Sequence, residues 1–167
     1  MASKPPEASP IGGGAWHGND TLWRTIVVLN RILLYARADG SLADTPQRRY
    51  VAIVDGIVAG QGQGPLVPDP LPAGVLLLGE NAVAVDVVGA TVLGMDPARL
   101  PQIVRAFDPS PYPLITGTVE DVPVVTDVAE WRGGLAAVRA HSLRARPPLG
   151  WRGFVELDAP EPERRAG

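Results

Sequence analysis

An acid and a glycine-rich run lie next to each other between residues 53 and 64, and together they could form a ligand site. Asp55 follows the apolar run 51–54, and α/β proteins often place ligand-binding acids at the end of a strand. A local Asx-turn, in which the Asp55 carboxylate accepts from the amide of Ile57, fits the same residues. Both interpretations stay open at this point.

Glycine alternates with glutamine in the next segment, Gly60-Gln61-Gly62-Gln63-Gly64. Glycines tolerate positive φ and let a ligand approach backbone N–H groups, which can form an anion-binding concavity. No Lys-Ser/Thr pair follows, so the segment is not a phosphate-binding P-loop. A loop with a purely structural role is the alternative. The candidate ligand contacts are Gly60, Gln61, Gly62 and Gly64.

Asp86 is surrounded by apolar residues in a predicted helix over residues 82–93. A helix that is apolar on nearly every side is buried, so its acid needs a hydrogen-bonded partner, a cation or a proton. The favourable helix dipole near the first turns is a structural alternative. We expect Asp55 and Asp86 to face a common cavity, where two carboxylates could hold a magnesium-type cation.

Residues 16–20 place an aromatic ring, an imidazole and small polar groups just before the first predicted helix. Trp16, His17, Asn19 and Asp20 could therefore contact an anion at the helix start. The alternative is an N-cap combined with a hydrophobic staple.

Composition excludes several classes of protein. The 167 residues fit one domain, and the net charge of −3 gives no basic surface for nucleic acid. There is no cysteine, so disulfides and iron–sulfur clusters are excluded, and we expect no haem. No window has the ~18 apolar residues of a membrane span, and no secretory signal is evident, so we expect a soluble cytoplasmic protein.

Hydrophobic periodicity predicts an α/β fold with a mixed or mainly parallel sheet packed against helices. We expect a disordered leader over 1–14, a single α/β domain over 15–158 and a loose tail over 159–167. The predicted helices span residues 22–34, 82–93 with Asn81 as the N-cap, 97–107 and 129–140. The predicted strands span residues 50–58, 74–79, 119–126 and 153–157.

Four stretches in this order resemble the family called domain of unknown function 362: WHGNDTLWRTIVVLNRILLY, IVDGIVAGQGQGP, PAGVLLLGENAVAVDVVGATVLGMDP and LGWRGFVEL. The resemblance implies that the chain corresponds to the C-terminal half of such a protein. Family members usually carry an acid where this chain has Gln61, and an amide there weakens the case for a cation.

The sequence is compatible with two functions. The first is binding of, or catalysis on, a small polar ligand, with a divalent cation as a possible cofactor. The second is a non-catalytic or degenerate partner domain that needs a separately encoded N-terminal half. The sequence predicts that strand 74–79 and helix 82–93 are buried on all sides, so other elements must pack against them. We therefore expect self-association, or pairing with a chain that supplies that half.

Overall fold

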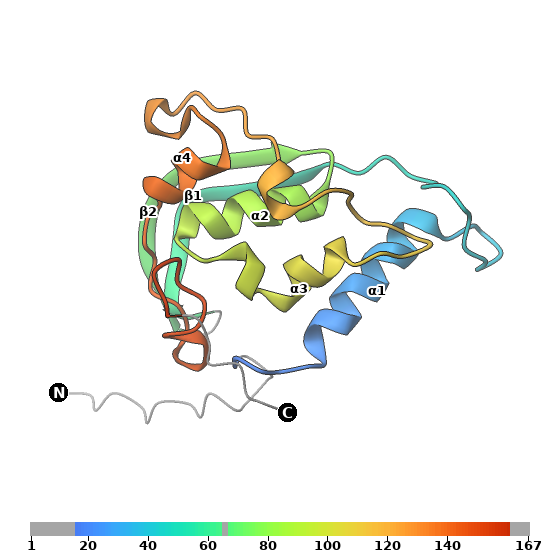
Figure 1. Ribbon diagram of the computed structural model, residues 1–167, viewed down its shortest axis with the longest axis horizontal. Helices are drawn as coiled ribbons and strands as arrows, with labels where there is room; N and C mark the ends of the chain where they lie inside the picture. The colour runs from blue at the N-terminus through green and yellow to red at the C-terminus, as the bar shows by residue number, and fades with distance from the viewer. Residues whose placement is uncertain (1–15, 65–66, 161–167) are drawn as a thin grey trace.

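A computed structural model describes residues 16–64 and 67–160, with four α-helices and two strands in that part of the chain (Figure 1). The elements are α1 (Leu22–Tyr35), β1 (Ala52–Gln63), β2 (Val67–Gly79), α2 (Ala82–Leu93), α3 (Pro101–Val104) and α4 (Leu135–Ala140). Short 3-10 turns span Pro97–Arg99, Arg105–Phe107, Val119–Asp121, Ala129–Trp131 and Leu149–Trp151. The predicted leader and most of the predicted tail lie outside the described residues.

The two strands form one antiparallel hairpin, so the predicted mixed or mainly parallel sheet is wrong for the described residues. Only residues 64–66 connect β1 to β2, whereas parallel strands need a crossover of a dozen or more residues. The predicted glycine loop is part of β1, where Gly60 allows close pairing. A Cβ on Gly60 would lie 2.9 Å from the Cβ of Pro68.

Two predicted strands do not form. Residues 119–121 make a 3-10 turn and residues 122–126 have no partner, while residues 153–157 make turns and one isolated bridge, Met95 to Glu156. The predicted helices over 97–107 and 129–140 are each broken into shorter pieces. Pro101 and the pair Gly133-Gly134 fall at these breaks, because proline and glycine interrupt regular helices.

Helix α2 has the predicted bounds and lies at the centre of the core. Asn81 caps its start by accepting from the amide of Ala84, and Gly94 ends it with a left-handed φ of 85°. Val87 and Val92 are fully or almost fully buried, and each contributes roughly 1.5–3 kcal/mol through burial. The helix packs against α4, α3 and one face of the hairpin. These contacts fix the positions of α3, α4 and the hairpin relative to α2.

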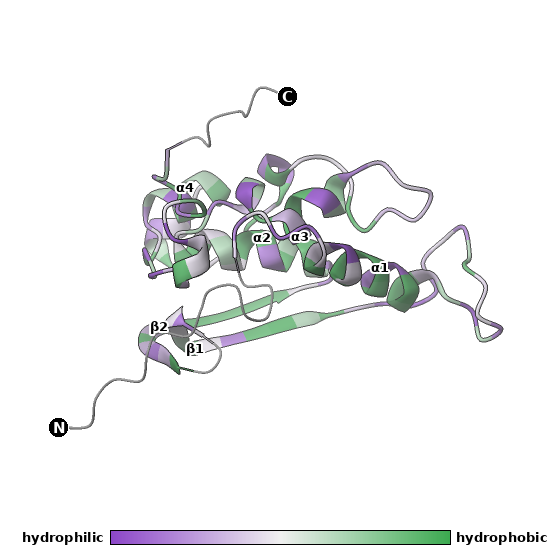
Figure 2. Ribbon diagram, turned by 90° about the horizontal axis from the view of Figure 1, so that it is seen from below, coloured by the Kyte–Doolittle hydropathy of each residue, from purple (hydrophilic) through white to green (hydrophobic). Residues whose placement is uncertain are grey.

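The helices cover only one face of the hairpin (Figure 2). Val75 and Leu77 are half-buried on the face toward α2, while Leu76 and Leu78 on the opposite face are 68% and 71% exposed. Ile53, the cross-strand neighbour of Leu78, is 68% exposed as well. The prediction that strand 74–79 is buried on all sides is therefore wrong within the described chain. We call the side chains of Ile53, Leu76 and Leu78 the outer face.

Helix α1 confirms the first predicted helix and packs against α3. At its end the hydroxyl of Tyr35 donates to the carbonyl of Pro113. The other side of α1 exposes further large apolar residues, among them Leu29 and Ile32. Within residues 16–64 and 67–160, no helix is long and apolar enough to cross a membrane.

We predict that Asn81→Ala lowers the free energy of unfolding by about 2 kcal/mol, because it removes two hydrogen bonds. The side-chain Oδ1 of Asn81 accepts from Ala84 N at 3.0 Å, and its side-chain Nδ2 donates to the Leu114 carbonyl at 2.8 Å. Asn81→Asp keeps the first and loses the second, so it should have an intermediate effect. Urea unfolding measures both. Thr25→Ala, at an exposed position of α1, is the control. Equal stability of Asn81→Ala and the unmodified protein would contradict this account.

Candidate functional site

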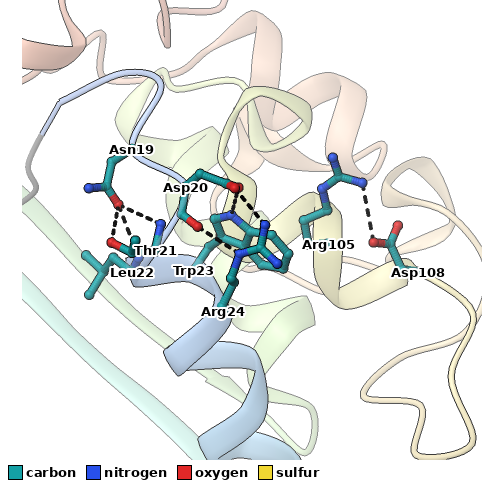
Figure 3. A network of polar contacts seen from close by, with 8 residues as sticks. All are labelled: Asn19, Asp20, Thr21, Leu22, Trp23, Arg24, Arg105 and Asp108. Atoms are coloured by element: carbon teal, nitrogen blue, oxygen red, sulfur yellow. Dashed lines mark hydrogen bonds and ion pairs between the residues drawn. The ribbon is translucent and has the colours of Figure 1, made fainter.

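The Asn19-Asp20 corner is occupied by contacts with its own chain (Figure 3). Asn19 Oδ1 accepts from the amides of Thr21 and Leu22, each at 3.1 Å. The Asp20 carboxylate accepts from Arg24 Nη2 at 2.6 Å and from Trp23 Nε1 at 2.9 Å. The Arg24 hydrogen bond, followed by that of Trp23, lowers the pKa of Asp20. These contacts lie at the start of α1, where Asn19 accepts from the first turn while the N-cap residue Thr21 makes no side-chain capping bond.

His17 packs against the late segment of the chain. Its ring stacks on Phe154 with centroids 4.2 Å apart and meets the edge of Trp151 at 5.9 Å. Its backbone amide donates to the carbonyl of Gly150 at 2.7 Å. Trp16 is the exposed neighbour. The His17 ring therefore packs the start of the described chain against the segment 151–154.

The glutamines of the glycine run hold the segment 146–149. Gln61 Oε1 accepts from Arg146 N at 3.1 Å, and Gln63 Oε1 accepts from Leu149 N at 2.7 Å. Between them Gly62, with φ of 76°, donates its amide to the Arg146 carbonyl at 2.7 Å. Gly64 lies in the following turn. The run joins β1 to the C-terminal segment, which explains why glycine and glutamine alternate.

Asp55 forms the predicted local turn. Its Oδ1 accepts from the amide of Ile57 at 3.2 Å, beside the bulge between Gly56 and Val58. In the register, Asp55 pairs with Leu76, so its side chain lies on the outer face, away from α2. The Asx-turn is confirmed.

Asp86 lies on the other side of the hairpin and is exposed, although partial loss of hydration raises the pKa of its carboxyl. The expectation that Asp55 and Asp86 share a cavity is therefore wrong. Within residues 16–64 and 67–160, no three His, Asp or Glu side chains come together as a metal site would require.

A cleft of about 850 Å³ lies elsewhere, between β2 and the segment 122–128. Residues 74–81 line one wall, and residues 122–128 line the other. Ala84, Val85 and Val88 of α2 form an apolar floor, with Trp131 and Val138 adjoining it. None of the site residues predicted from the sequence lines this cleft.

The described lining of the cleft is acidic. It includes Glu80, Asp121 and Asp127 and contains no Lys, Arg or His. Asp121 accepts from the hydroxyl and the amide of Thr118, and these hydrogen bonds lower its pKa, so it stays ionised at neutral pH. Glu80 pairs with Arg49 at 3.1 Å, but both side chains are exposed and such pairs are weak. Sequence reasoning missed the cleft, because it assigned residues 119–126 to a paired strand.

We predict that Gln61→Ala and Gln63→Ala speed amide hydrogen exchange at Arg146 and Leu149, respectively, because each change removes the acceptor of that amide. Residue-resolved exchange by NMR measures the effect. Gln47→Ala, which alters a glutamine bonded only within its own loop and α1, is the matched control. Unchanged exchange at both amides would show that the glutamines do not hold the segment.

Comparison with known proteins gives one family match. A family model described as domain of unknown function (DUF362) matches residues 8–91. No curated protein and no solved structure gives a match. The matched residues include the Asn19-Asp20 corner, the glycine run, both strands and most of α2, while the late stretch 149–157 lies outside them. Because the match spans half of the 167 residues, the chain belongs to the DUF362 family of domains of unknown function.

Proposed function

We propose that this chain is a non-catalytic partner domain, which binds another polypeptide chain through its hairpin. The observation that carries the proposal is the outer face, where Ile53, Leu76 and Leu78 are each more than two-thirds exposed, while the helices lie on the other side of the hairpin (Figure 2). Clustered exposed side chains of this size are typical of interfaces, whereas single exposed ones are not. Val58 continues the same strand and is 63% exposed.

The hairpin also has too few strands to be stable by itself. Two-stranded sheets are marginal in water, and stability normally comes from a third strand or from packing on both sides. Here α2 covers one face only. The outer edge of β1 makes one backbone hydrogen bond near its C-terminal end, in which the amide of Gly62 donates to the carbonyl of Arg146. A partner chain that covers the outer face would complete the layer that the helices leave open.

The polar residues favour the same function. Asn19, Asp20, Asp55, Gln61 and Gln63 all make hydrogen bonds with their own chain, as described above. A site for a small polar ligand needs several polar groups that converge and remain free to bind. The candidates instead lie at separate junctions of the fold. We therefore prefer a partner domain to a catalytic domain acting on a small polar ligand.

We predict that the purified protein self-associates at micromolar concentration, since without its partner the outer face pairs with another copy. The double variant Ile53→Thr with Val58→Thr should shift it toward monomer, because threonine keeps the β-branched shape but adds a hydroxyl. Light scattering across a concentration series measures the mass.

The matched control is Val28→Thr with Ile32→Thr, which makes the same two replacements on the exposed side of α1. It should leave the association intact. A stable monomer with a cooperative thermal transition would contradict the proposal. Loss of association in the α1 control alone would place the interface on α1 and also contradict it.

A further inference from the structure

We propose that the cleft beside β2 takes an extended strand from the partner chain, apolar in its middle and positively charged at its ends. This inference rests on the proposed function and adds the mode of binding. The strand would lie between β2 and the segment 122–128 and would bond to the backbones of both. Strand addition at an open sheet edge is a common way of binding a peptide.

The residues of β2 that line the cleft belong to both faces of the strand. Side chains alternate between the two faces of a strand, so a groove on one face would touch every second residue. Here every residue from 74 to 79 lines the cleft, including Leu76 and Leu78, which point to the outer face. The cleft therefore runs along the edge of β2. Within the described residues, this stretch makes no backbone hydrogen bond outside the hairpin.

The opposite wall is a strand sequence without a partner. Residues 122–126, Val-Pro-Val-Val-Thr, are rich in β-branched residues, which favour strands. The backbone is extended where this segment begins, at Val122. Nevertheless, residues 123–127 form no backbone–backbone hydrogen bond with any other described residue. The backbone groups of this segment are therefore available for pairing, and so are those on the edge of β2 across the cleft.

The space between these walls is large enough to hold a short stretch of extended chain. Six residues of a strand span about 20 Å, neighbouring strands lie about 5 Å apart, and a sheet occupies about 10 Å between packed layers. A slot with these dimensions encloses roughly 1,000 Å³. The cleft volume of about 850 Å³ is close to that value. A single inserted strand of about six residues is therefore compatible with its size.

The floor and the rim define the chemistry of the inserted strand. Ala84, Val85 and Val88 offer an apolar floor to one set of its alternating side chains. Asp121, Asp127 and Glu80 make the described lining negative, and although Arg49 outside the lining pairs with Glu80, no basic residue of the lining faces the two aspartates. Complementary charge therefore requires Lys or Arg in the inserted strand.

The experiment uses a synthetic probe on the full chain. The probe is a seven-residue peptide in which three valines alternate with two threonines between terminal lysines. Calorimetric titration should show binding, and at about ten times Kd the amides of residues 74–79 and 122–128 should exchange about tenfold more slowly. The same peptide with alternate backbone nitrogens methylated should not bind, because methylation removes the donors that pair with the edge.

Charge is tested separately. A peptide with terminal glutamates should bind more weakly than the lysine peptide, and Asp127→Asn should weaken the lysine peptide by about two- to fivefold at low salt. Asp44→Asn, at an exposed position in the loop before β1, is the matched control and should leave binding unchanged. Equal binding of the methylated peptide, or protection confined to residues outside both walls, would overturn the inference.

The two proposals fail separately. If the Ile53→Thr and Val58→Thr variant loses self-association while the unmodified chain ignores the lysine peptide, the partner domain stands and strand insertion is wrong. If the lysine peptide binds and protects both walls in a chain that stays monomeric, strand insertion stands and the outer-face interface is wrong.

Discussion

The packing of α2 against one face of the hairpin is the interaction on which the rest of the structure depends. α2 is apolar along most of its length, and it buries valines against α3, α4 and the inner side of the strands. The segment after α4 is bonded to the end of α2, since Leu143 N donates to the Val92 carbonyl and Ala145 N to that of Leu93. Residues 94–96 in turn bond to residues 155–157. One helix thereby organises elements from most of the described chain.

The same interaction leaves the hairpin half covered. The helices gather on one side (Figure 2), and the side chains of Ile53, Leu76 and Leu78 on the other side remain exposed among the described residues. The polar residues that first suggest a ligand site serve a different purpose. Gln61, Gln63 and His17 join distant segments, and Asp55 stabilises a bulge. The polar groups are used in contacts within the fold, whereas the outer face and the edge of β2 have no partner among the described residues.

Local features could be predicted from the sequence. Helices α1 and α2, the Asn81 cap and the Asp55 turn all follow from interactions within a few residues. The pairing of the sheet could not be predicted, because both strands run through glycines and prolines, which normally indicate turns. Residues 122–126 have strand propensity, yet nothing in the described chain pairs with them. Glycine-rich segments usually indicate turns, so the sequence predicts a loop over residues 60–64, whereas residues 60–63 pair with residues 67–70 of β2 directly across the hairpin turn.

The central claim is that the hairpin is completed by another chain, and the most direct measurement is amide exchange of β1 and β2 as a function of protein concentration. Exchange of residues 52–63 and 67–79 should slow as concentration rises through the range in which chains associate, whereas buried amides of α2 should change little. Hairpin amides that are already as protected as those of α2 at the lowest concentration, and stay so throughout, would contradict the account.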